Sequence, residues 1–262
     1  MADYVRPKKH LGQHFLKDNG VAMAIVDSLN PNTEFLLEIG AGTGVLTQFI
    51  QKKDFKDFKI IEIDQESVNY LLNHFDNLEH RIMQGDFLSL KLDQIFPNKF
   101  SIIGNFPYNI SNQILFKVYD YRQQVVEVVG MFQKEVAERI AAKSGSKTYG
   151  ILSVLLQAYY DIEYLFTVNE DVFIPPPKVK SGVIKLVRNS VEKLDCNETL
   201  FKTVVKTAFN QRRKTVGNAL KSIGSKEWPE EYKEILGKRA EQLNVVDFVL
   251  LTNLAATTIS PV

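Results

Sequence analysis

The chain has 262 residues, with 32 basic and 31 acidic side chains, 45% hydrophobic residues and one cysteine, Cys196. This length and composition predict a globular protein of one or two domains, and a lone cysteine excludes an internal disulfide or a cysteine-rich metal site. No apolar run approaches the ~18 residues that span a bilayer, and the basic N-terminus lacks the apolar stretch of a secretory signal, so we expect a soluble, cytoplasmic protein.

Short apolar runs alternate with helical patterns over the first two-thirds of the chain. The runs are rich in β-branched residues and are bounded by polar residues or glycine, which is typical of buried strands in a parallel sheet. Strand–helix alternation predicts βαβ units and a doubly wound sheet. The predicted strands are 34–39, 58–63, a weaker 81–83, 100–104 and 125–131, followed by a late antiparallel hairpin of 162–168 and 181–187. The predicted helices between them are 21–29, 65–75, 133–143 and 152–159.

The composition changes near 188–197, after which the chain is rich in helix formers. We expect four short helices there, at 198–209, 216–223, 230–236 and 246–256. The sequence therefore predicts two domains: an α/β catalytic domain at 1–187 and a small helical domain at 188–262, which we expect to recognise RNA.

A glycine-rich segment, EIGAGTG, follows the first predicted strand and contains Glu38, Gly40 and Gly42. Glycine permits a tight turn and a close approach of the backbone to a ligand. Glu62 ends the second strand, where a carboxylate can accept both ribose hydroxyl hydrogens. Because the spacing is GxGxG rather than GxGxxG, a nucleoside cofactor without phosphates, such as S-adenosylmethionine (SAM), is favoured over a dinucleotide, and a plain strand–helix turn is the structural alternative. Asp86 could bind an adenine amino group or cap a turn.

The tetrapeptide Asn105-Phe106-Pro107-Tyr108 follows the predicted strand 100–104. An exocyclic nucleobase amine is a poor nucleophile, so its methylation needs acceptors that hold the amine hydrogens and aim the lone pair. The Asn105 side-chain oxygen and the Phe106 carbonyl could serve, with Pro107 fixing the turn and Tyr108 stacking on a flipped base. The structural alternative is an X-Pro turn with an aromatic residue packed inward.

Positive charge is clustered although the net charge is only +1. Residues 1–187 carry 20 basic and 22 acidic side chains, net −2, and residues 188–262 carry 12 and 9, net +3. Acid-free basic segments indicate phosphate contacts, with a solvated helix face as the alternative. We expect the segment Arg212–Lys214 at the N-terminal end of a helix, where the macrodipole disfavours cations, so that its charges would serve a partner. The candidate RNA-binding residues are Lys8, Lys9, Lys178, Lys180, Arg212, Arg213 and Lys214.

Together these motifs resemble a known family. KKHLGQHFL, EIGAGTG, IEID, GDF, GNFPYNIS, FIPPPKVKSGVI and AFNQRRKT occur in the order found in the rRNA adenine N6-dimethyltransferases, over nearly the whole chain. The resemblance implies a Rossmann-like class I SAM-dependent methyltransferase fold, with a mostly parallel seven-stranded sheet and a small C-terminal all-α domain. It is nearest to the housekeeping branch, which implies N6,N6-dimethylation of two adjacent adenosines near the 3′ end of 16S rRNA during biogenesis of the small ribosomal subunit.

The resemblance also implies roles for single residues. It places His14 and Leu16 in an N-terminal SAM-binding segment, and Tyr108 and Phe173 around the target base. Many members read GQNFL where this chain reads GQHFL, so protonation of His14 would make SAM binding pH-sensitive. The predicted cofactor set is His14, Leu16, Glu38, Gly40, Gly42, Glu62, Ile63, Asp86, Phe87 and Asn105, and the predicted catalytic set is Asn105, Phe106, Pro107, Tyr108 and Phe173.

Other functions remain open at this point. A relative of the antibiotic-resistance type would methylate large-subunit rRNA, and an assembly factor would act through subunit binding more than through methylation. A dehydrogenase fits the glycine loop alone, and a DNA adenine methyltransferase shares only the amine chemistry. We expect a monomer, and we expect no metal because His10, His74 and His80 have no suitably spaced partners.

Overall fold

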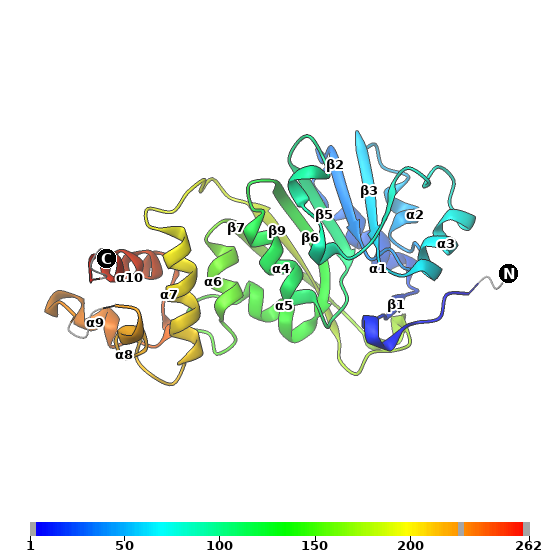
Figure 1. The fold of residues 1–262 in the computed structure, drawn as a ribbon. Helices are drawn as coiled ribbons and strands as arrows, with labels where there is room; N and C mark the ends of the chain where they lie inside the picture. Colours follow the sequence, from blue (N-terminus) through cyan, green and yellow to red (C-terminus); the bar gives the residue numbers. More distant parts are fainter. Residues whose placement is uncertain (1–3, 225–227, 259–262) are drawn as a thin grey trace. The chain divides into compact units, whose positions relative to one another are not determined.

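The computed structural model describes residues 4–224 and 228–258 (Figure 1). Its main feature is a seven-stranded sheet with the strand order β4-β3-β2-β5-β6-β9-β7. The first five of these strands pair in parallel, and β9 runs antiparallel to β6. The strands are β2 (Phe35–Ile39), β3 (Asp57–Glu62), β4 (Ile82–Gln84), β5 (Phe100–Asn105), β6 (Val125–Gln133), β7 (Tyr160–Val168) and β9 (Ser181–Arg188). The predicted mostly parallel, doubly wound sheet is confirmed.

The order of the strands reverses between β2 and β5. The chain builds β3 and β4 on one side of β2 and then crosses to β5 on the other side. In open α/β sheets, ligands bind in the crevice outside the carboxyl ends of the strands at such a point. The glycine-rich segment follows β2, and Asn105 ends β5. The two motifs singled out in the sequence therefore meet at the reversal.

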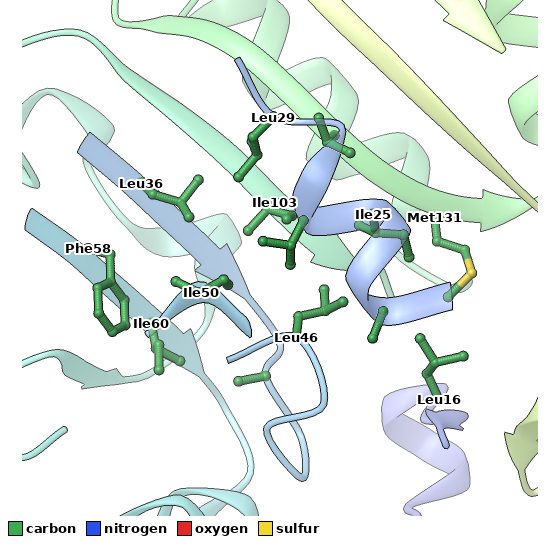
Figure 2. Close-up of a cluster of buried hydrophobic side chains, with 14 of the residues drawn as sticks. Leu16, Ile25, Leu29, Leu36, Leu46, Ile50, Phe58, Ile60, Ile103 and Met131 are labelled. Atoms are coloured by element: carbon green, nitrogen blue, oxygen red, sulfur yellow. The ribbon is translucent and has the colours of Figure 1, made fainter. Parts of the chain in front are cut away.

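Helices cover the sheet in the first part of the chain (Figure 1). The Asp18 side chain caps α1 by accepting a hydrogen bond from the Val21 amide at 2.9 Å. Figure 2 shows Ile25 of α1 in a buried cluster with Ile103 of β5 and Met131 of β6, so this helix is packed on the strands that carry the site. The helices here are α1 (Asn19–Asp27), α2 (Thr47–Ile50), α3 (Gln65–His74), α4 (Ser111–Asp120) and α5 (Lys134–Ala141).

A second, two-stranded sheet was not predicted. In it β1 (Phe15–Leu16) pairs antiparallel with β8 (Phe173–Ile174), with Leu16 opposite Phe173. Each strand has two residues, too few for a period-two pattern to be visible in the sequence. The pair joins the N-terminal segment, which we call the N-terminal arm (residues 5–16), to the proline-rich connection before β9.

The chain divides into two compact units: Met1–Glu138 with Ile162–Arg188, and Arg139–Asp161 with Asn189–Val262. The second unit therefore takes in residues 139–161, which the sequence analysis placed in the first domain. Its helix α6 packs against α7 and α10. Its helices are α6 (Ile151–Gln157), α7 (Glu198–Asn210), α8 (Val216–Ala219), α9 (Lys233–Leu236) and α10 (Val245–Thr258). The separate roles assigned to 1–187 and 188–262 stay predictions.

The basic segment Arg212–Lys214 lies between two helices of the second unit. Helix α7 ends at Asn210 and α8 begins at Val216, so the prediction that this segment starts a helix is wrong. The segment lies between the C-terminus of α7, where the macrodipole favours cations, and the N-cap Thr215 of α8, where it disfavours them. Its position thus gives no independent sign of a partner. None of the helices in the described part of the chain combines the length and apolar character that crossing a membrane requires.

Candidate active site

A cavity of about 190 Å³ lies at the carboxyl ends of β2, β3 and β5. Its walls come from the N-terminal arm, the glycine-rich segment, the end of β3, the residues after β4 and the turn after β5. Most predicted site residues are brought together there: His14, Gly40, Gly42, Glu62, Ile63, Asp86, Phe87, Asn105, Phe106, Pro107 and Tyr108.

The two glycines after β2, Gly40 and Gly42, make room for different neighbours. Gly40 and Gly42 have φ of +69° and +56°, a region that glycine adopts without steric cost. A Cβ on Gly42 would lie 2.8 Å from the ring of Phe15, whereas the nearest atom to a Cβ on Gly40 would be 4.0 Å away. Gly42 therefore makes room for the N-terminal arm, and Gly40, which lines the cavity, leaves open space that a ligand can fill.

Glu62 presents a fixed carboxylate in the cavity wall. It is 3% exposed, and its two oxygens accept hydrogen bonds from the amides of Gly42 and Asp64, each at 2.9 Å. Burial raises the pKa of Glu62, and these backbone hydrogen bonds act in the opposite direction. The amides fix the orientation of the carboxylate, and its remaining lone pairs can accept the two hydroxyl hydrogens of a ribose.

Glu38 lies beneath the glycine-rich segment rather than in the cavity wall. Its side chain is 1% exposed and accepts a hydrogen bond from the Thr47 hydroxyl at 2.8 Å. Burial raises the pKa of Glu38 to about 8; the Thr47 hydrogen bond opposes this shift and the nearby Glu62 carboxylate adds to it. Because the carboxyl turns inward to α2, it supports the loop from below; a contact of Glu38 with the cofactor stays a prediction.

Asp86, Phe87 and Ile63 form another part of the wall. Asp86 is exposed and accepts a hydrogen bond from the Leu88 amide at 2.8 Å, which caps the short 3-10 helix Phe87–Ser89. The cap uses one oxygen, so the carboxylate can also accept from an adenine amino group. The side chain of Ile63 is apolar yet 49% exposed. A planar base lying on Ile63 would cover this apolar surface.

The turn after β5 is held rigidly. The Asn105 side-chain Nδ2 donates to the backbone oxygen of His14 at 2.9 Å, which directs the amide oxygen to the opposite side. The Phe106 amide donates to the Met131 oxygen at 3.1 Å, and the Phe106 ring packs against Phe132 with 4.9 Å between ring centroids. A Cβ on Gly130 would lie 2.2 Å from the Phe106 ring, so this glycine makes room for the buried aromatic side chain.

Tyr108 is positioned from two sides. Its hydroxyl and that of Ser181 lie 2.6 Å apart in a hydrogen bond, and its ring stacks on His14 with 5.4 Å between centroids. Burial raises the pKa of Tyr108, and the hydrogen bond to Ser181 opposes that shift. His14 Nδ1 lies 2.7 Å from the backbone oxygen of Pro175. The proposed pH sensitivity of SAM binding through His14 stays a prediction.

The side chains of Leu16 and Phe173 are buried away from the cavity. They are 2% and 1% exposed and belong to the core cluster. Pairing of β1 with β8 places the two residues opposite each other and turns both side chains inward. In this structure neither side chain lines the cavity, and the roles of Leu16 toward SAM and of Phe173 toward a target base stay predictions.

The candidate RNA-binding residues are all exposed except Lys8, which is half-buried. Three of the seven also make polar contacts within their own unit: Lys8 pairs with Asp64, Arg212 lies 3.5 Å from Glu241 and donates to the Lys147 oxygen at 2.5 Å, and Lys214 donates to Gln211 at 2.8 Å. RNA binding by all seven stays a prediction.

Sequence reasoning missed several contacting residues, among them Gln13, Phe15 and Ser181. Gln13 and Phe15 line the cavity, and Ser181 holds Tyr108. The first two stand inside the motif KKHLGQHFL, from which the cofactor prediction took only His14 and Leu16. Ser181 follows the proline-rich connection and carries no local signal, because its contact spans 73 positions of sequence.

The residues that line the cavity suit SAM. Gly40 leaves space for a ligand, Glu62 offers acceptors for a ribose, and Asp86 with Ile63 offers an acceptor and an apolar surface for an adenine. Over residues 4–224 and 228–258, no group of three or more His, Cys, Asp or Glu side chains is arranged to hold a metal ion.

Comparisons with known proteins agree on the family. The model of the family described as ribosomal RNA adenine dimethylase matches residues 5–256. A protein of Cytophaga hutchinsonii named ribosomal RNA small subunit methyltransferase A is 58% identical over 95% of this chain and 97% of its own length. One of the same name from Parabacteroides distasonis is 57% identical over 95% and 93%.

Solved structures give the same fold. A dimethyladenosine transferase from Plasmodium falciparum aligns with a TM-score of 0.72 and 27% identity, over 91% of this chain and 96% of that one. A 23S rRNA methyltransferase aligns with a TM-score of 0.68 over 91% and 99%, but at 21% identity it speaks for the fold alone. This chain is thus a SAM-dependent methyltransferase, and it belongs to the ribosomal RNA adenine dimethylase family.

Proposed function

We propose that this protein transfers methyl groups from SAM to the N6 amines of two adjacent adenosines near the 3′ end of 16S rRNA, on the small ribosomal subunit. The relatives that are 57–58% identical carry the name of a small-subunit methyltransferase, which favours this substrate over large-subunit rRNA. We place the reaction in the cytoplasm and assign it to a monomer.

The orientation of Asn105 carries the proposal. Its Nδ2 is committed to the His14 oxygen, so its amide oxygen is available as an acceptor for a target amine. The backbone carbonyl of Phe106 would accept the second amine hydrogen. Since the Phe106 ring and amide are anchored to the neighbouring strand, both acceptors stand in one fixed turn.

Positioning supplies most of the catalytic effect. SAM supplies an electrophilic methyl group when it is bound. The two acceptors hold the amine hydrogens and aim the nitrogen lone pair, and Tyr108 supplies a ring on which the flipped base can stack. The amine becomes acidic only as the new N–C bond forms, so its proton passes to solvent without a strong base.

Exposed cations supply the remaining contacts. Lys9, Lys178, Lys180 and Arg213 are free to reach phosphates, and each phosphate contact makes the affinity for RNA more dependent on salt. We assign the helical domain to recognition of the subunit.

The test is transfer of labelled methyl groups from SAM to isolated small and large subunits, followed by mapping of the modified bases. We expect two adjacent dimethylated adenosines in small-subunit rRNA and loss of label with Asn105→Ala. Label in large-subunit rRNA alone would contradict the proposal.

A further inference from the structure

An acidic residue beside the cofactor site holds the N-terminal arm. Asp64 follows Glu62 by two positions, and its side chain is 1% exposed. Its Oδ1 accepts hydrogen bonds from the Glu66 amide at 3.1 Å and from the ammonium of Lys8, and its Oδ2 accepts from the Gln13 side-chain amide at 3.2 Å. The same carboxylate therefore caps α3 and anchors the arm.

Asp64 is also bonded directly to the carboxylate that we assign to the ribose. Its backbone N–H donates to Glu62 Oε1 at 2.9 Å, while Gly42 donates to the other oxygen. A shift of Asp64 would therefore move a donor on which the orientation of Glu62 depends.

The arm is anchored at two points, Asp64 and Asn105. The Lys8 amide donates to the Gln13 side-chain oxygen at 2.8 Å, which closes the arm into a compact turn that contains the 3-10 helix Lys9–Leu11. Lys8 and Gln13 fix this turn on Asp64, and the backbone oxygen of His14 holds Asn105 at the other end. Residues 11–15 of the arm line the cavity.

The charge of Lys8 balances a buried anion. Burial by itself would raise the pKa of Asp64, but hydrogen bonds from Lys8 and Gln13 hold that pKa below its usual range. Lys8 also lies 3.5 Å from Glu66. Removing one partner of a buried ion pair leaves an uncompensated charge and is strongly destabilising for the local structure.

We propose that Lys8 is a positioning residue for the cofactor site: its ammonium fixes the arm to Asp64 and thereby sets the arm wall of the cavity and the orientation of Glu62. This inference rests on the SAM site described above. It separates Lys8 from the neighbouring Lys9, whose exposed side chain remains a candidate for phosphate contacts.

The test compares Lys8→Met with Lys9→Met, a matched loss of one charge at the adjacent position. SAM dissociation constants are measured on the free enzyme by titration calorimetry, and binding to small subunits is measured across a salt series. We expect Lys8→Met to raise the SAM Kd by about tenfold or more, to raise the KM for SAM more than it lowers kcat, and to leave the salt slope unchanged. Lys9→Met should leave the SAM Kd within about twofold of wild type and lower the salt slope by about one.

Further variants separate positioning from a general loss of folding. Asp64→Asn keeps a side chain that caps helices well but removes the charge, and it should raise the SAM Kd much as Lys8→Met does. The double variant should be no worse than either single one, because both remove the same contact. Lys8→Arg should retain a SAM Kd within about threefold of wild type, since guanidinium also pairs with carboxylate.

An unchanged SAM Kd in both Lys8→Met and Asp64→Asn would overturn the proposal, as would a lowered salt slope in Lys8→Met with normal SAM binding. SAM titration needs no RNA. Failure of wild-type protein to methylate small subunits is therefore a separate outcome, which would count against the proposed function only.

Discussion

Two glutamates near the cavity differ in what surrounds them. Glu62 receives two backbone amides, which stabilise its charged form, whereas Glu38 receives one hydroxyl and is fully buried. Burial therefore dominates at Glu38, whose pKa rises to about 8. Near neutral pH Glu38 is therefore largely a neutral acid beneath the loop, whereas Glu62 faces the cavity with two backbone amides bonded to its oxygens.

The protonation of Glu38 predicts a pH-dependent stability. The pKa of Glu38 in the folded protein, about 8, exceeds the ordinary value of 4.5 for a glutamate. The contribution of protonated Glu38 to the free energy of unfolding is therefore complete below about pH 4.5. It is lost as the pH rises through about 8, and the free energy of unfolding falls by no more than about 1.4 kcal/mol per pH unit. Glu38→Gln has no proton to lose, so its stability relative to wild type should increase between pH 5.5 and 8.5. Urea unfolding at both pH values measures this, and a constant difference between the two proteins would contradict it.

The hydrogen bond between Tyr108 and Ser181 predicts a second residue-scale effect. Tyr108→Phe and Ser181→Ala each remove the bond but keep the ring. A single hydrogen bond contributes about 0.5–1.5 kcal/mol, so each variant should lower kcat/KM for the small subunit by about 2- to 12-fold. The SAM Kd should stay unchanged, because the hydroxyl pair lies outside the proposed cofactor contacts. Tyr108→Ala, which removes the stacking ring, should lose far more activity; equal losses in all three variants would argue against stacking.

At the scale of elements, the short β1–β8 pair connects the N-terminal arm to the core. Phe173 is buried there opposite Leu16, beneath the segment that forms one wall of the cavity. Phe173→Leu keeps an apolar side chain of similar size and should keep nearly normal activity. Phe173→Ala leaves a cavity and should cost about 3–5 kcal/mol of stability and weaken SAM binding.

Unfolding curves and rRNA methylation of these two Phe173 variants measure both effects. If Phe173 instead left the core to stack on a target base, Phe173→Leu would raise the KM for small subunits strongly while the protein stayed stable. That result would support the role implied by family resemblance.

The elements differ in how far their sequences predict them. The buried strands β2, β3, β5 and β6 are runs of β-branched and apolar residues, so their positions were predicted to within two residues. The strands β1 and β8 have no such run, since they exist only because residues 15–16 and 173–174 meet across the fold. Glu38 and Glu62 illustrate the same limit within the site: both motifs were recognised, but only tertiary burial separates their roles.

Across the whole molecule, a count of basic residues overstates the charge that is free to bind RNA. Lys185 belongs to an acid-free segment of the sequence, yet its ammonium lies 3.1 Å from Glu127 and donates to the Ser28 oxygen at 2.6 Å. Lys8 is likewise committed to Asp64. The +3 net charge of residues 188–262 therefore does not show which cations can contact RNA. Binding depends on which individual cations are exposed.

Two adjacent arginines provide a test of this distinction. Both side chains are exposed, but Arg212 also contacts Glu241 and the Lys147 oxygen within the second unit. Arg213→Ala should lower the salt slope of small-subunit binding by about one and leave thermal unfolding unchanged. Arg212→Ala should instead cost about 0.5–1.5 kcal/mol of stability and leave the slope near that of wild type. Salt titrations and melting curves of both variants measure these effects. An equal fall in the salt slope of binding for both variants, with no loss of stability, would mean that both arginines contact the RNA.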